Sequence, residues 1–427
     1  MSAPEWIDAA LVSARPQAVA ALLRYFRDLD VAEEAFQDAC LRALRNWPRK
    51  GPPRDPVAWL IFVGRNAALD LVRRRRRQQE LPPEEALSDL SDTESELVQR
   101  LDEADFRDDL LRLLFVCCHP GLQPAQQIAL ALRIVSGLSV QQIARAFLVS
   151  EAAMEQRITR AKSRIGTSSV PFEAPSPGER IERLAAVATM LYLLFNEGYS
   201  SSGPADIRNH LCGEAIRLTR LLLRLFPGDP EMSGLTALML LQHSRSAARA
   251  GADGNIVLLE EQDRDLWDRA MIEEGLALLD GAVGHARPGP YQVQAAIAAL
   301  HSRASSARET DWSGIERLYA TLERMQPSPV VTLNRSVAVA KVRGPSEALS
   351  LIEPLARRLA GYFHFHAIRG AYLRELGRED DAREAFQRAI GLAGSAAEAA
   401  HIRQHLDQLV PQPPAASRSG TGAPQSQ

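Results

Sequence analysis

Strong net charge, aromatic residues, cysteine and long apolar runs are all scarce in this sequence of 427 residues. A formal net charge of -3 argues against a protein that coats nucleic acid over its whole surface. The four cysteines lack the paired spacing of a zinc site or a disulfide framework. No stretch approaches the roughly 18 apolar residues of a membrane span, and no apolar signal segment opens the chain. We therefore expect a protein of the reducing cytoplasm.

Runs rich in Val, Ile and Thr are also scarce, whereas Ala, Leu and Arg recur at helical spacing. Hydrophobic residues make up 46% and charged residues 24%, the balance of a globular protein with a sizeable core. The length exceeds that of one ordinary domain. We predict an all-α protein of several domains.

Signatures of catalysis are missing as well. The sequence has no Gly-rich phosphate loop, no nucleophile elbow and no zinc-type His-Glu spacing. Cys117, Cys118 and His119 lie in the apolar context LLFVCCHPGL, which favours core packing over a metal site. The acidic cluster of Glu260, Glu261, Asp263 and Asp265 is typical of surface or interhelical partners. We expect no enzyme activity, no metal and no cofactor.

Proline-rich and charged stretches divide the chain into six segments. We predict helical domains over 1–80 and 106–167, an acidic linker over 81–105, a Pro-rich linker over 168–180, a helical region over 181–410 and a disordered tail over 411–427. An unbroken Arg run at 73–77 precedes a segment, 78–109, that holds twelve acidic and two basic residues. The acidic segment can be a solvated tether, and its excess of negative charge would also suit a cationic partner.

The clearest local motif is GLSVQQIARAFLVSEAAMEQRITRAKSRI, residues 137–165. Ser139 can cap a short helix, and Ser150 a second one. The apolar positions of both helices face one side, at Val140, Ile143, Ala144 and Phe147 and then at Met154, Ile158 and Ala161. Two short helices joined by a tight turn form a helix-turn-helix. The second helix offers Arg157, Arg160, Lys162 and Arg164 to phosphates and base edges.

The first domain carries two informative helices. In DVAEEAFQDACLRALRNW, residues 30–47, an apolar stripe leaves polar faces that include Glu33, Glu34, Gln37 and Asp38. After a turn, VAWLIFVGRNAALDLVRRRRR, residues 57–77, runs from buried positions to a polar patch and the Arg run. Trp47 and Trp59 beside a basic helix could stack on unpaired bases, or could simply belong to the core.

A spacing of 34 residues recurs near the end of the sequence. Gly370, Ala382, Phe386 and Ala389 have the spacing with which tetratricopeptide repeats nest one helix against the next. One repeat earlier stand Ser336, Ala348, Ile352 and Leu355, and a weaker match contains Gly314 and Leu318. We predict two or three stacked helix pairs with a surface for a peptide or protein partner.

The order of these parts resembles the sigma factors of the extracytoplasmic-function type, which direct core RNA polymerase to promoters. The motifs AEEAFQDACLRAL, AWLIFVGRNAALDLVRRRRR and the helix-turn-helix look like their polymerase-binding helix, their -10 helix and their -35 reader. LYLLFNEGYSS, LLEEQDRDLWDRAMIEEG and GPYQVQAAIAALH are similar to the extension of the group with a tetratricopeptide-type C-terminal domain, which is thought to govern activity.

The resemblance implies a role for each matched position. The polymerase-binding residues would be Glu33, Glu34, Gln37 and Asp38. The -10 contacts would come from Trp47, Arg65, Asn66, Arg73, Arg74 and Arg75, with the loop 48–56 at the pocket for a flipped base. The -35 contacts would come from Arg157, Arg160, Lys162 and Arg164, while Glu155 departs from the usual pattern. The acidic linker would thread a cationic polymerase channel.

Two other interpretations stay open. A conventional regulator would use the helix-turn-helix as a dimer on palindromic duplex DNA, without polymerase. A repeat scaffold derived from a sigma factor would keep the C-terminal surface and lack sigma activity. The expected partners are core RNA polymerase and promoter DNA, and the repeat domain would contact the sigma domains or another protein.

Overall fold

The computed structural model describes residues 5–51, 53–77, 103–119, 121–147, 149–166, 177–200, 205–249, 257–283 and 288–409. These residues form helices and turns and contain no β-strand, so the predicted all-α class is confirmed. The C-terminal tail lies outside the described residues, as do the acidic linker up to residue 102 and the Pro-rich linker up to residue 176. Among the described helices, none is both long and apolar enough to cross a membrane.

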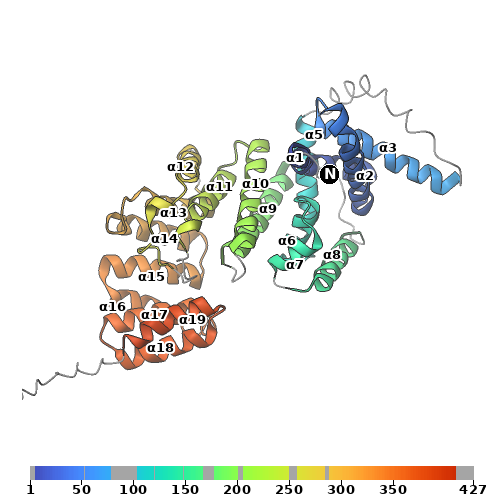
Figure 1. Ribbon diagram of the computed structural model, residues 1–427. Coiled ribbons are helices and arrows are strands. Elements are labelled where there is room, and N and C mark those ends of the chain that lie inside the picture. The colour runs from blue at the N-terminus through green and yellow to red at the C-terminus, as the bar shows by residue number, and fades with distance from the viewer. Residues whose placement is uncertain are drawn as a thin grey trace, which may run out of the picture. The chain divides into compact units, whose positions relative to one another are not determined.

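The chain divides into two compact units, Met1–Leu235 and Thr236–Gln427 (Figure 1). The helices of the first unit are α1 (Glu5–Phe26), α2 (Leu29–Lys50), α3 (Pro56–Arg77), α5 (Glu103–Cys117), α6 (Pro124–Ile134), α7 (Val140–Ala146), α8 (Glu151–Gly166), α9 (Pro177–Ser200) and α10 (Ala205–Leu225). Helix α11 (Pro230–His243) crosses the boundary between the units.

The first three helices pack on one another and form the core of the predicted N-terminal domain. Asp28 caps α2, because its carboxylate accepts from the backbone N–H groups of Asp30 and Val31. Helix α2 does not end at Trp47, as the sequence suggested, but runs through Pro48 to Lys50 and stops at Gly51 with a φ of +81°. The predicted loop 48–56 is therefore shorter.

Helices α5 to α10 complete the first unit. Helix α5 packs on α1, and α6, α7 and α8 pack on one another. The hairpin of α9 and α10 belongs to the same unit, because α9 contacts α5 and α6, and α10 contacts α7. Its buried side chains include Val187, Leu191, Leu194 and Phe195. The start of the predicted extension thus packs on the helix-turn-helix region.

The second unit is a succession of helices in which each packs on the next along the chain. They are α12 (Arg269–Val283), α13 (Pro290–Arg303), α14 (Trp312–Met325), α15 (Pro329–Arg343), α16 (Pro345–Ile352), α17 (Phe363–Glu375), α18 (Glu379–Leu392) and α19 (Ala396–Asp407). Contacts between sequence neighbours are the pattern of helical-repeat proteins. The assignment to the tetratricopeptide class stays a prediction.

The positions chosen from the 34-residue spacing lie where helices meet. Ala348, Ile352, Ala382, Phe386 and Ala389 are all fully buried. A Cβ atom on Gly370 would lie 2.6 Å from two ring carbons of Phe386, so only glycine allows α17 and α18 to approach this closely. Ser336 is also buried, and its hydroxyl lies 3.0 Å from that of Tyr372 on α17.

Candidate nucleic-acid interface

Helices α7 and α8 form the predicted helix-turn-helix. The Ser139 hydroxyl accepts from the Gln142 backbone N–H, and the Gln142 side chain accepts from the Ser139 N–H, which makes a capping box. The Ser150 hydroxyl accepts from the Ala153 N–H at the start of α8. Met154, Ile158 and Ala161 are buried, as the periodicity predicted. The caps and the buried stripe fix which face of α8 points outward.

The outward face of α8 presents basic side chains, although not all to the same degree. Arg160 and Arg164 are exposed, and Arg157 is half-buried with its guanidinium 5.7 Å from the ring centre of Phe147. Lys162 is half-buried, and its ammonium faces helix α2. Its ammonium lies 2.6 Å from an Asp30 oxygen and 3.0 Å from a Glu33 oxygen, both on α2. Lys162, which the sequence assigned to the -35 interface, therefore contacts Glu33, which it assigned to the polymerase interface.

Glu33 does not lie on an exposed face of α2, where the pattern of the sequence placed it. Its exposed fraction is 5%, whereas Glu34 and Gln37 are exposed and Asp38 is half-buried. Two further cations reach the same carboxylate: Arg15 on α1 and Arg133 on α6, each at 3.3 Å from Oε1. A carboxylate leaves water only when cations or hydrogen-bond donors replace its hydration, and here they come from three helices.

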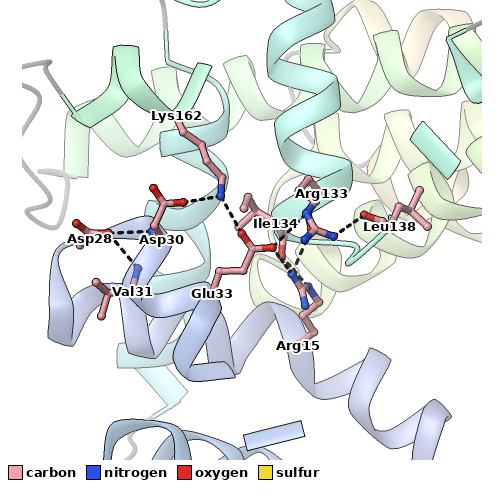
Figure 2. Close-up of polar contacts among 9 residues, drawn as sticks. All are labelled: Arg15, Asp28, Asp30, Val31, Glu33, Arg133, Ile134, Leu138 and Lys162. Atoms are coloured by element: carbon pink, nitrogen blue, oxygen red, sulfur yellow. Dashed lines mark hydrogen bonds and ion pairs between the residues drawn. The ribbon is translucent and has the colours of Figure 1, made fainter. Parts of the chain in front are cut away.

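We call Arg15, Asp30, Glu33, Arg133 and Lys162 the Glu33 cluster (Figure 2). Figure 2 shows the Glu33 carboxylate between the Lys162 ammonium on one side and the two guanidinium groups on the other. Burial alone would lower the pKa of Lys162, but hydrogen bonds and charge from Asp30 and Glu33 outweigh it and raise that pKa. The cluster thus holds Lys162 in its charged form.

Arg15 also ties α1 to the end of α6. Its guanidinium donates to the backbone carbonyl of Ile134 at 2.9 Å and to that of Arg133 at 3.2 Å. A cation at a helix C-terminus is stabilised by the helix dipole. Gly137, with a φ of +75°, makes room for this side chain, because a Cβ there would lie 2.8 Å from the Arg15 Cδ. Burial lowers the pKa of Arg15, against the opposing charge of Glu33.

Arg15 and Arg133 were not among the residues singled out from the sequence. A signal for them exists, because each interrupts an apolar segment, ALVSARPQAVA for Arg15 and IALALRIVSG for Arg133. A charged residue within an apolar stripe needs a partner once the stripe is buried. The sequence pattern does not show which residue that partner is.

The residues assigned to the -10 element divide into two groups. Arg65 is exposed, with its guanidinium 4.5 Å from the ring centre of Tyr25, and Asn66 is half-buried. Arg73, Arg74 and Arg75 lie in the last turns of α3, where only the backbone is described. All five of these residues lie on α3.

Trp47 lies apart from them, in the core. The residue is 2% exposed, and its ring centre lies 6.1 Å from that of Trp6 and 5.3 Å from that of Trp59. In this arrangement Trp47 supports the end of α2 and has no face open to a base.

The other polar clusters noted in the sequence have structural partners. Cys117 and Cys118 are buried as predicted, and burial raises the pKa of Cys118 to about 12. Glu260 pairs with Lys341 at 2.7 Å, and Asp263 caps a short 3₁₀ turn at Arg264–Leu266. No group of three metal-ligating side chains occurs among the described residues.

Comparison with known proteins relates these elements to families. Residues 11–78 match sigma-70 region 2, residues 112–165 match sigma-70 region 4, and residues 183–283 match a family of unknown function, DUF6596. Over 409 residues the chain is 67% identical to an uncharacterized protein of Rhizobium meliloti, which covers 96% of this chain and 97% of that protein.

A second relative has a more informative description. Over 181 residues the chain is 29% identical to a probable ECF RNA polymerase sigma factor, SigI, of Mycobacterium tuberculosis. The match covers 42% of this chain and 61% of that protein. The region 2 match begins within α1 and includes α2 and α3 with Glu33, and the region 4 match includes α7 and nearly all of α8 with Lys162. The chain therefore carries a sigma-70 region 2 and a sigma-70 region 4, is similar to a probable extracytoplasmic-function sigma factor, and continues beyond region 4 into a helical extension.

Proposed function

We propose that this protein is an alternative sigma factor that directs core RNA polymerase to promoters with its own -10 and -35 elements. The observation that carries the proposal is the presence of regions 2 and 4 in one chain, with α8 presenting Arg160 and Arg164 to solvent. Exposed basic residues on the second helix of a helix-turn-helix can reach phosphates and guanine edges in the major groove.

The two regions would act at different promoter sites. The exposed acidic and amide groups of α2, at Glu34 and Gln37, would contact polymerase. Arg65 and Asn66 would hold the unpaired -10 strand, and the arginines at the end of α3 would bind its phosphates in a salt-sensitive manner. Trapping flipped bases offsets an unstacking cost of a few kcal/mol. The polymerase performs the chemistry.

The extension would control this activity. Two observations support that role: its first hairpin, α9 and α10, packs on the helices of region 4, and the second unit offers stacked helices of the kind that bind proteins. The predicted linker 81–105 would enter the cationic channel of polymerase. A loss of transcription when the second unit is removed would show that the extension activates, and a gain would show that it restrains.

Run-off transcription with purified core polymerase tests the proposal. We expect the full chain to start transcripts at promoters selected from the host genome. A truncation after Gly228, which keeps α9 and α10, should then raise or lower this activity if the second unit has a controlling role. No transcript from either protein, with active polymerase, would contradict the proposal; binding to palindromic duplex DNA without polymerase would then identify a conventional regulator.

Substitution of Arg160 tests the -35 contact separately. Arg160→Ala should weaken promoter-specific transcription by about tenfold, since one good bidentate contact to a base is worth about 1–3 kcal/mol. Arg403→Ala is the matched control, because Arg403 is an exposed arginine on α19. Equal activity of both variants would remove Arg160 from the DNA interface.

A further inference from the structure

One aromatic side chain of region 2 lies in solvent beside the helix proposed to hold the unpaired -10 strand. Tyr25, in the last turn of α1, is 46% exposed. The guanidinium of Arg65, on α3, lies 4.5 Å from the centre of the Tyr25 ring. Asn66 follows Arg65 along α3. The ring therefore lies next to the part of α3 from which the -10 contacts are proposed to come.

The other aromatic residues near α3 are less open to a base. The sequence suggested Trp47 and Trp59 as stacking surfaces, but Trp47 is buried and Trp59 is half-buried against it. Trp6 is 39% exposed, and its ring is stacked on that of Trp47. Among the described residues, Tyr25 is the most exposed of the phenylalanines, tyrosines and tryptophans.

The surroundings of Tyr25 are basic. Arg24 and Arg27 flank Tyr25 and Phe26 in the sequence. Arg24 is paired with Asp109 at 3.3 Å, whereas Arg27 is exposed and forms no ion pair within the part of the chain that the structure describes. Surfaces that bind single strands combine cations, which hold phosphates, with aromatic rings, which stack on bases. The end of α1 has both kinds of group.

The contact with Arg65 prepares the Tyr25 ring for a ligand. A guanidinium over an aromatic face is attracted by the negative charge of that face. A ring that is already held in one orientation loses less conformational freedom when a base stacks on it. The positive charge of Arg65 also favours the phosphates on either side of such a base.

We propose that Tyr25 is a stacking platform for one unpaired base of the -10 strand, the role that the sequence suggested for Trp47. The platform selects single-stranded DNA over duplex DNA, because a base within a duplex already stacks on its neighbours and cannot reach the ring. It is tolerant of base identity, since every base has a face that can stack. This inference rests on the proposed function, because it adds a residue to the same -10 interface.

Four variants of the full-length chain test the platform. Tyr25→Ala removes the ring, and Tyr25→Leu removes the ring but keeps an apolar side chain that favours a helix. Tyr25→Phe keeps the ring and loses only the hydroxyl. Val12→Ala, at another exposed apolar position of α1, is the control. Circular dichroism checks that each variant is folded; if Tyr25→Ala is not, Tyr25→Leu decides.

The first readout is the affinity of the polymerase holoenzyme for a forked DNA. This DNA carries a duplex -35 segment and an unpaired -10 strand from a promoter selected by run-off transcription. We expect Tyr25→Ala and Tyr25→Leu to bind it about tenfold more weakly than the parent, the effect of losing one stack between a base and an aromatic ring. Tyr25→Phe and Val12→Ala should bind like the parent. Parental affinity in the folded Tyr25→Ala and Tyr25→Leu variants would overturn the platform.

An abasic scan separates stacking from an indirect effect on the fold. Each nucleotide of the unpaired strand is replaced in turn by an abasic site, which removes the base and keeps the phosphate. We expect one position at which this change weakens binding of the parent by about tenfold but does not weaken binding of Tyr25→Leu. A ring that only supports the fold would instead lower the affinity equally for every DNA, and this result would also overturn the platform.

Affinity for core polymerase without DNA distinguishes a contact with protein. We expect no change for Tyr25→Leu. A loss of this affinity, without dependence on any base of the strand, would show that Tyr25 faces polymerase and not DNA.

The two proposals fail in different ways. If the parent chain gives no transcript with active polymerase, the sigma function falls and the platform falls with it. If the parent supports transcription but the Tyr25 variants bind the forked DNA as the parent does, only the platform falls.

Discussion

Single charged residues decide the local chemistry of this protein through partners that are far away in the sequence. Glu33 lies 129 residues from Lys162, and Arg15 lies 119 residues from the carbonyl of Ile134 that it binds. The helical pattern of α2 correctly placed Ala35, Phe36, Ala39 and Ala43 in the core, but Leu44 of the same apolar stripe is exposed. It could not place Glu33 there, because periodicity records which face a residue occupies and not which cations will meet it.

His301 gives a prediction at the same scale. Burial, together with the positive charges of Arg245 and Arg264, lowers the pKa of His301 from 6.5 to about 4. As the pH falls, His301 therefore takes up a proton in the unfolded chain before it does so in the folded chain. The free energy of unfolding of the second unit should decrease as the pH falls from about 6.5 to about 4, by about 1–3 kcal/mol.

His301→Gln should remove part of this dependence on pH, which urea unfolding at a series of pH values can measure. His243, His364 and His405 also have lowered pKa values and contribute in the same direction, so the difference between variant and parent isolates His301. His210→Gln, at an exposed position of the first unit, is the control. Parallel curves for His301→Gln and the parent would contradict the assignment.

At the scale of elements, the sequence was most informative where one short-range rule determines the outcome. The caps at Ser139 and Ser150 and the buried stripe of α8 follow from hydrogen bonds and side-chain periodicity within a few residues. The end of α2 did not follow, because Pro48 suggested a stop. The helix continues for three residues and ends where Gly51 adopts a positive φ.

The packing of α17 against α18 gives a prediction for one glycine. Gly370→Ala should lower the free energy of unfolding by about 1–3 kcal/mol, since the new methyl group would overlap the Phe386 ring. Gly391→Ala, in the exposed last turns of α18 with open space around it, should instead be neutral or stabilising by up to about 1 kcal/mol. Denaturant unfolding compares the two. Equal effects would mean that Gly370 is not a close-contact position.

At the scale of the whole molecule, the fold class and the order of the regions could be predicted, but the extent of the first compact unit could not. The Pro-rich stretch suggested that the helix-turn-helix ends near residue 167 and that a separate region follows. That boundary stays a prediction, while the compact unit that contains the helix-turn-helix extends to Leu235. The local sequence does not indicate that α9 packs on α5 and α6, because this packing requires only apolar faces. Every amphipathic helix has such a face.

The two possible truncations should therefore differ in stability. A chain that ends after Ser169 loses α9 and α10 and exposes the faces of α5, α6 and α7 that they cover. Each large side chain removed from such an interface costs about 2 kcal/mol. We expect this protein to unfold at a lower urea concentration than a chain that ends after Gly228. Equal midpoints would show that the hairpin does not stabilise region 4.

The tryptophans divide between the two units in a way that gives each its own optical signal. Three of the five, Trp6, Trp47 and Trp59, form one ring cluster where α1, α2 and α3 meet. Trp267 and Trp312 lie in the second unit, the former with the guanidinium of Arg264 4.6 Å from its ring centre. Emission from a chain ending after Gly228 thus comes only from the region 2 cluster, and single-stranded DNA, which contains no tryptophan, becomes visible without any added label if it disturbs the end of α2.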